Sequence, residues 1–200
     1  MDPALLPGLI GFAFVSLITP GPNNLMVMAS GARFGVGRSL PHVLGIALGF
    51  SGMVVAVGLG LMGVFEAVPG SQAVLRWASL AYLLWLAWHI AAAPPVPPAA
   101  EPPPGARPLG FWGAVAFQWI NPKAWAMALS ALAAFTADHA LGGVLAVAGA
   151  FLVLGLPCIL AWTALGHEMR RVLTSPARMR AFNVLMAVLL VLSVLPVLWH

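Results

Sequence analysis

Long apolar stretches, separated by short polar connections, follow one another along the whole chain. A helix needs about 17 to 25 apolar residues to cross the hydrocarbon core of a bilayer, and several stretches are that long. Apolar and polar residues do not alternate with a period of two, so the pattern predicts helices rather than the strands of a membrane barrel. The expected spans are residues 5–30, 40–64, 72–93, 110–136, 141–165 and 181–199.

The composition is that of a chain whose solvent is lipid. Of its 200 residues, 62% are hydrophobic and only 7% are charged, whereas a soluble globular domain has about 25% charged residues. The formal charge of +4 does not indicate a nucleic acid partner, because the basic residues lie in short connections and do not form one patch. We therefore expect an all-α integral membrane protein with six transmembrane helices and the lipid bilayer as a partner.

A proline-rich segment divides the single membrane domain into two halves of three spans each. Residues 94–108, PPVPPAAEPPPGARP, are too rich in proline for a helix and are expected to form a polyproline-type linker. A shift of 102 residues aligns the ITP at 18–20 with the INP at 120–122. Because three spans per half is an odd number, residues 1–93 and 109–200 are predicted to be inverted repeats, which are typical of transporters.

Arginine residues indicate the orientation of the spans. Seven of them lie in alternate connections on one side, which the positive-inside rule places in the cytoplasm. Both termini are then expected outside the cytoplasm. These residues are Arg33, Arg38, Arg107, Arg170, Arg171, Arg178 and Arg180.

The first expected span is interrupted by two prolines and a glycine, which an ordinary helix cannot contain so close together. Lipid cannot satisfy the freed carbonyl groups, so the break must face protein or a watery cavity. Thr19 or Gly21 can cap a second half-helix, with the following proline at its first position. A simple kink is the alternative, but two asparagines would be costly in hydrocarbon without partners. The candidate substrate-binding residues here are Thr19, Pro20, Gly21, Pro22, Asn23 and Asn24.

The fourth expected span carries a second interruption beside a lysine. Asn121 fits the cap of a half-helix and Pro122 its first position. Lys123 lies about 12 residues into the span, roughly 18 Å deep and near the middle of the bilayer. An ammonium group there needs an anionic partner or a wet cavity, unless the lysine snorkels to the interface, which is the alternative. The candidate residues here are Gln118, Asn121, Pro122 and Lys123.

The two interruptions are expected to face each other near the midplane and to bind one zwitterion. Two helix N-termini and the Lys123 ammonium would attract a carboxylate, while unwound carbonyls and amide side chains would accept bonds from an ammonium group. None of the expected spans contains Asp or Glu, so a cationic side chain would find no counter-charge. The pattern predicts a secondary transporter of neutral amino acids rather than of lysine or arginine.

Other classes of protein need residues that the sequence lacks, or leave Lys123 unexplained. A membrane thiol-redox enzyme requires two cysteines, and Cys158 is the only one. A metal exporter would need clustered Asp, Glu or His within the spans, and an ATP-driven one a GxxxxGK[ST] loop. We therefore expect neither enzymatic activity nor a cofactor or bound metal. A non-transporting membrane subunit or scaffold stays open, as do export of another small zwitterionic metabolite and a homodimer.

A few further residues receive structural interpretations. His42 and His89 are expected as interfacial histidines, with a part in proton coupling as the alternative. Gly45, Gly49 and Gly52 form a small-residue face on the second span, which favours close helix packing.

Two segments of the chain resemble the signatures of a known transporter family. SLITPGPNNLMVMASGARFG, followed by HVLGIALG, is similar to the N-terminal signature of the LysE/RhtB amino acid exporters, and FQWINPKAW is similar to their second signature. The length and the six apolar spans match as well. The resemblance implies export of an amino acid or close derivative across the bacterial inner membrane, driven by the proton gradient, with residues 20–24 and 121–123 at the site.

Overall fold

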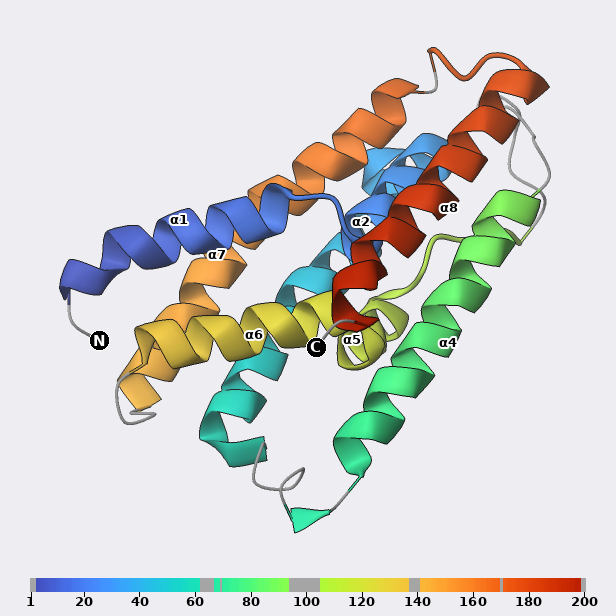
Figure 1. The fold of residues 1–200 in the computed structure, drawn as a ribbon. Coiled ribbons are helices and arrows are strands. Elements are labelled where there is room, and N and C mark those ends of the chain that lie inside the picture. Colours follow the sequence, from blue (N-terminus) through green and yellow to red (C-terminus); the bar gives the residue numbers. More distant parts are fainter. Residues whose placement is uncertain are drawn as a thin grey trace.

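The computed structural model describes residues 3–61, 67–68, 70–93, 105–136, 141–169 and 171–198. Within these ranges the regular structure is helical, which confirms the all-α prediction (Figure 1). Among the described residues, three stretches are long and apolar enough to cross a membrane: Pro22–Gly60, Ala73–Ala92 and Leu141–Met169. The elements in chain order are η1 (Pro3–Leu5), α1 (Leu6–Ile18), α2 (Pro22–Ala56), η2 (Val57–Leu61), α4 (Ser71–Ala92), α5 (Phe111–Ile120), α6 (Pro122–Phe135), α7 (Leu141–Met169) and α8 (Pro176–Leu198).

Helix α2 is a hairpin of two helical segments rather than one straight rod. Its backbone leaves helical geometry at Gly35, where φ is 80° and ψ is 169°, and glycine enters this region at little cost. Ser30 Oγ and His42 Nδ1 lie 3.0 Å apart across the turn, although a straight helix would separate these residues by about 18 Å. The turn falls between the first two expected spans, so their connection consists of a single non-helical residue.

Glycines allow α2 and α7 to approach until their backbones touch. A Cβ atom on Gly31 would lie 2.0 Å from the carbonyl oxygen of Thr163, and one on Gly166 would lie 1.9 Å from that of Met28. Neither space admits even a methyl group. The packing of α2 on α7 therefore requires glycine at both positions.

The predicted small-residue face of α2 is confirmed at two of its three positions. A Cβ on Gly45 would lie 2.4 Å from the carbonyl oxygen of Phe111, and one on Gly49 would lie 2.8 Å from Cα of Val115, both in α5. Gly52 faces open space, because no described atom outside its own stretch of helix lies within 4 Å of the position that its Cβ would take. The face therefore serves the contact with α5 over a single turn of α2.

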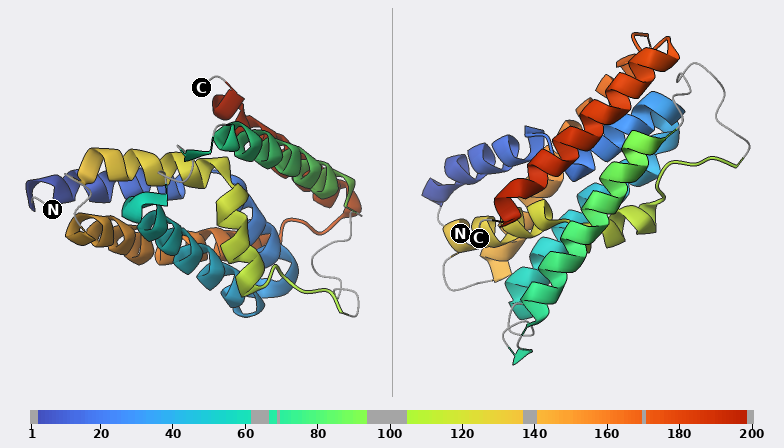
Figure 2. Two further views of the ribbon diagram at one scale, coloured as in Figure 1. Left: turned by 90° about the horizontal axis from the view of Figure 1, so that it is seen from below. Right: turned by 45° about the vertical axis from the view of Figure 1, so that its right-hand side comes forward.

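Large apolar side chains cover the outside of the helices, while the core lies between them. Trp112 is 77% exposed and Val153 is 69% exposed, as suits a surface that meets hydrocarbon. One cluster of buried side chains, which includes Phe50 and Phe151, joins α1, α2, α6 and α7. Helices α4 and α8 pack side by side along one flank, as both views of Figure 2 show.

The start of the last helix differs from the expected span. Helix α8 begins at Pro176, five residues before the expected boundary at 181. Ser175 explains the earlier start, because its Oγ accepts a hydrogen bond from the backbone N–H of Arg178 at 3.3 Å. A capping serine followed by proline at the first helical position is a favourable start for a helix.

Most of the expected proline-rich linker, residues 94–104, lies outside the described residues. Its described end, from Gly105 to Pro108, is not helical. Arg38 Nη2 donates to the carbonyl oxygen of Ala106 at 3.0 Å. This bond ties the end of the linker to the hairpin turn of α2.

Replacing Gly166 with alanine should destabilise the protein by about 1–3 kcal/mol, because a methyl group would force two packed backbones apart. Gly149→Ala is the matched control in the same helix, since no atom lies within 4 Å of a Cβ there. The control should be neutral or slightly stabilising, because alanine favours helix more than glycine does. Thermal unfolding of both variants in detergent measures the difference, and equal midpoints would contradict the backbone contact.

Candidate functional site

The first interruption is a break of three residues between α1 and α2. The segment from Thr19 to Gly21 is extended, and Gly21 rather than Thr19 is the capping residue of α2. The side chain of Asn24 turns back to the break, where Nδ2 donates to the carbonyl oxygens of Leu17 at 2.8 Å and of Thr19 at 3.0 Å. The first turn of α2 thus satisfies carbonyls that the break frees.

The second interruption is a single residue, Asn121, between α5 and α6. Its Oδ1 accepts a hydrogen bond from the backbone N–H of Lys123 at 3.1 Å, which confirms the predicted N-cap. The carbonyl of Trp119 consequently lacks its usual helical donor, and the indole N–H of Trp125 donates to it at 2.9 Å. Both predicted interruptions are therefore present, while their depth in the membrane stays a prediction.

The two breaks do not correspond in the register that the sequence suggested. Ile18 and Ile120, which end α1 and α5, are 102 residues apart as expected. Pro22 and Pro122, which begin α2 and α6, are 100 residues apart. The expected match of Pro20 with Pro122 is wrong, because the first break is two residues longer and Pro20 lies inside it.

Lys123 joins the two breaks. Its Nζ donates to the carbonyl oxygen of Thr19 at 2.6 Å and to that of Pro20 at 3.4 Å. These carbonyls follow the C-terminus of α1, whose dipole favours a positive charge. The lysine stem passes over Gly21, where a Cβ would lie 2.6 Å from Cδ of Lys123. Glycine at position 21 thus leaves the lysine its path to the first break.

A reciprocal pair of amides forms a second link between the two halves. Asn23 Nδ2 donates to Gln118 Oε1 at 2.8 Å, and Gln118 Nε2 lies 3.3 Å from Asn23 Oδ1. Gln118 Nε2 also donates to the carbonyl oxygen of Ala114 at 2.8 Å. Gln118 is fully buried, so this pairing holds the amide group of Asn23 in one orientation, toward α5.

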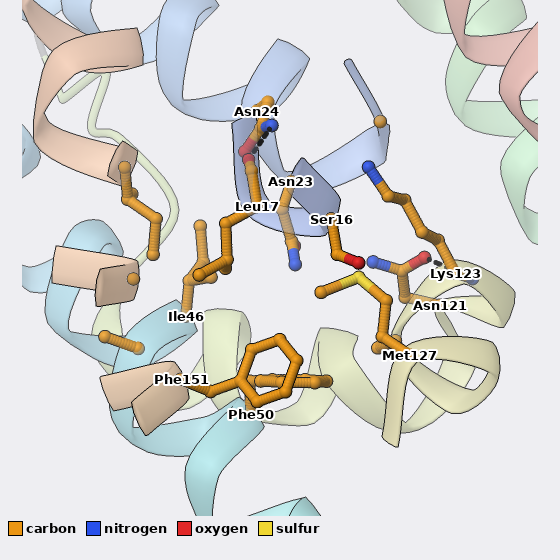
Figure 3. A pocket seen from close by; sticks show the side chains of 15 residues that line it. Ser16, Leu17, Asn23, Asn24, Ile46, Phe50, Asn121, Lys123, Met127 and Phe151 are labelled. Atoms are coloured by element: carbon orange, nitrogen blue, oxygen red, sulfur yellow. Dashed lines mark hydrogen bonds between the residues drawn. The ribbon is translucent and has the colours of Figure 1, made fainter. Parts of the chain in front are cut away.

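A small cavity of about 40 Å³ lies where the two breaks meet (Figure 3). This volume has room for about three water molecules, so the cavity must widen to take an amino acid. Its polar wall consists of Gly21, Asn23, Asn24, Asn121 and Lys123. The remaining wall is mostly apolar and consists of Ser16, Leu17, Ile46, Ala47, Phe50, Ala124, Met127, Phe151, Gly155 and Ile159.

The five predicted site residues that do not line the cavity have supporting positions. Thr19 and Pro20 provide carbonyl groups to Lys123. Gln118 holds Asn23. Pro22 and Pro122 each begin the helix that follows a break.

Sequence reasoning missed the apolar wall of the cavity. Phe151, Gly155 and Ile159 recur every four residues and so share one face of α7, and Ile46 and Phe50 do the same on α2. This spacing was visible in the sequence. It does not say which face of a wholly apolar helix turns toward the breaks, so no sequence signal distinguished these residues.

The two histidines have different surroundings. His42 is only 1% exposed and shares a hydrogen bond with Ser30, so it lies between helices rather than on the outer surface, while its expected place at the membrane interface stays a prediction. His89 is exposed on α4, with its ring centroid 4.0 Å from that of Trp85. Of the two, His42 is the histidine that lies inside the helix bundle.

Paired interrupted helices that meet at a polar cavity, within a bundle of apolar exterior, are typical of membrane transporters. The family model of the LysE type translocators matches residues 14–196. The chain is also 30% identical over 195 residues to cysteine/O-acetylserine efflux proteins of Escherichia coli strain K12, Shigella flexneri and Salmonella typhimurium, covering 96% of this chain and 96% of each relative. The chain therefore belongs to the LysE type translocator family, which confirms the resemblance. No solved structure matches the chain.

Replacing Asn121 with alanine should destabilise the protein by about 1 kcal/mol, because the N-cap of α6 is lost. Asn121→Ser keeps an oxygen that can accept the same bond and is the matched control. Thermal unfolding in detergent compares the two. If alanine and serine at this position gave the same midpoint, the capping bond to Lys123 would contribute nothing.

Proposed function

We propose that this protein is a secondary transporter that exports small neutral amino acids or close derivatives from the bacterial cytoplasm, coupled to the proton gradient. The bond from the Lys123 ammonium to the carbonyl oxygen of Thr19, at 2.6 Å beside the cavity, carries this proposal. This bond brings together an ammonium group, backbone carbonyl groups that no helical N–H satisfies, and amide side chains. Such a set complements both ends of a zwitterion.

Lys123 occupies the carbonyl groups that a substrate ammonium would use. An entering amino acid replaces it there, so that the substrate ammonium bonds to the carbonyls of Thr19 and Pro20 while Lys123 turns to the substrate carboxylate. Each charge then keeps a partner throughout the exchange, which avoids the cost of an unpaired ion inside the membrane. The first-turn N–H groups of Asn23 and Asn24, at the end of α2 that no side chain caps, supply further donors to the carboxylate.

The preference for neutral substrates rests on the charges of the cavity. Its described lining contains no carboxylate, and a lysine or arginine side chain would bring a second positive charge toward Lys123 without a counter-ion. The relatives from enteric bacteria are described as cysteine/O-acetylserine efflux proteins, and both of these compounds are small amino acids without net charge. We propose substrates of the same kind here.

The proposed transport cycle uses six spans arranged as two inverted repeats in the inner membrane. In this arrangement α1 with the first segment of α2 makes one interrupted span, and α5 with α6 makes the other. Both second half-helices would then begin near the midplane. Rocking of one repeat against the other would open the cavity first to the cytoplasm and then to the outside.

His42 is the proposed carrier of the coupling proton. The described residues that line the cavity include no carboxylate for this part, whereas His42 is buried and bonded to Ser30 across the hairpin of α2. It lies one helical turn before Ile46 and two turns before Phe50, both of which line the cavity. An imidazole ring can both accept and donate a proton, which this exchange requires.

Reconstituted liposomes loaded with labelled amino acids should release cysteine and O-acetylserine under an imposed pH gradient, and release lysine and arginine much more slowly. Lys123→Met keeps most of the length of the side chain but removes its charge, and should lower efflux at least about tenfold, as expected for loss of a charged hydrogen-bond partner. Arg171→Gln is the control, because Arg171 is highly exposed and forms an ion pair with Glu168 at 3.3 Å on the surface.

The same assay separates the alternatives. Transport of lysine as fast as of cysteine would remove the neutral preference. Wild-type protein that is folded but moves no amino acid would favour a non-transporting subunit, and movement of only other small zwitterions would favour a different metabolite. Efflux without any response to the pH gradient would end the proposal of proton coupling.

Reporter fusions test the proposed orientation. With both termini outside the cytoplasm, alkaline phosphatase fused after His200 should be active, because it folds only outside the cytoplasm, whereas a fluorescent protein at the same place should stay dark. Fusion between α7 and α8, after Thr174, is the control and should give the opposite pair of results. A fluorescent C-terminal fusion would reverse the proposed topology.

A further inference from the structure

The cavity has two walls of opposite chemistry. In Figure 3 the side chains of Asn23, Asn121 and Lys123 lie on the side of the two breaks, while the rings of Phe50 and Phe151 lie on the other. A zwitterion whose charged ends are held by the breaks must therefore direct its side chain at the apolar wall. The apolar wall is consequently the part of the cavity that can distinguish one amino acid from another.

The aromatic part of this wall is fixed in place. The rings of Phe50 and Phe151 meet edge to face with centroids 5.0 Å apart, and Phe12 packs edge to face on Phe151 at 6.4 Å. Both cavity-lining rings are almost fully buried. Because displacing well-packed aromatic rings of this kind has an energetic cost, a substrate gains room more readily at the rest of the apolar wall.

Gly155 lines the cavity one helical turn after Phe151, and neither backbone conformation nor packing requires glycine there. Its φ is not positive, and a Cβ would stand 3.8 Å from Leu17 Cδ2 and 4.0 Å from Ile159 Cδ1, which are ordinary contacts. Gly31 and Gly166, by contrast, would collide with backbone. A glycine inside a helix costs about 1 kcal/mol relative to alanine, so Gly155 lowers helix stability and leaves in the cavity wall the room that an alanine methyl group would fill.

We propose that Gly155 and Met127 form the subsite for the substrate side chain and set its maximum length, so that the protein selects amino acids with short uncharged side chains. Gly155 provides the open volume on α7. Met127 lines the cavity with an unbranched and adaptable side chain. It lies on α6, one helical turn after Lys123 and on the same face of the helix. This inference rests on the proposed function, because it assigns the part of the same site that reads the side chain.

The test is efflux from liposomes with a graded series of labelled substrates: alanine, cysteine, O-acetylserine and methionine. Gly155→Ala should lower the ratio of two efflux rates about tenfold: the rate of the longest substrate in the series that the wild-type protein moves, divided by the rate of the substrate alanine. One methylene in an apolar pocket discriminates by about 10- to 200-fold. Gly149→Ala is the matched control on α7, because it lies outside the cavity and has open space around its Cβ position. It should leave the order of substrates unchanged.

Met127→Ala should change selectivity in the opposite direction and raise efflux of methionine relative to alanine. Provided that the wild-type protein transports these substrates, an equal effect of Gly155→Ala on the efflux of all four, or no effect, would overturn the subsite. If Gly155→Ala fails to fold, the Met127→Ala series decides, and an unchanged order of substrates overturns the inference. Wild-type protein that moves none of the four would overturn the proposed function itself, so the two failures are distinguishable.

Discussion

Carbonyl groups freed inside an apolar span must find donors within the protein, because hydrocarbon supplies none. The site follows from this requirement. Asn24 returns to the first break and Trp125 to the second, each from the helix that begins there. The carbonyls of Thr19 and Pro20 also accept bonds from Lys123, in the other half of the chain. One of the contacts that join the halves is therefore of a kind that a ligand with its own ammonium group can replace.

Local chemistry made the breaks predictable. Proline cannot donate a backbone hydrogen bond, and asparagine is a favoured N-cap, so the interruption before Pro122 and the cap at Asn121 follow from neighbouring residues alone. The length of the first break did not follow, because either Pro20 or Pro22 could begin the second half-helix. The structure selects Pro22, with Gly21 extended before it. Choices among equivalent local signals depend on the tertiary contacts that each would allow.

Tertiary contacts also explain why the glycines could not be sorted by sequence. Gly31 and Gly166 are needed because the backbones of α2 and α7 touch. Gly35 is needed for a positive φ that reverses the chain. Gly155 meets neither requirement, yet its missing side chain leaves space in the cavity. Glycine thus occurs at these positions for three different physical reasons, and only the surroundings of each position distinguish them.

The two breaks differ in chemistry, and this difference determines which of them is open to a ligand. The single-residue break at Asn121 is capped by that residue's own side chain, so it needs nothing from outside. The longer break leaves the N-terminus of α2 without a side-chain cap and draws Lys123 to its carbonyls. In the proposed function, a zwitterion binds at the first break only by releasing Lys123, which changes how α6 is held to α1 and α2. Substrate binding would in this way be coupled to the contact between the halves, as the proposed alternating access requires.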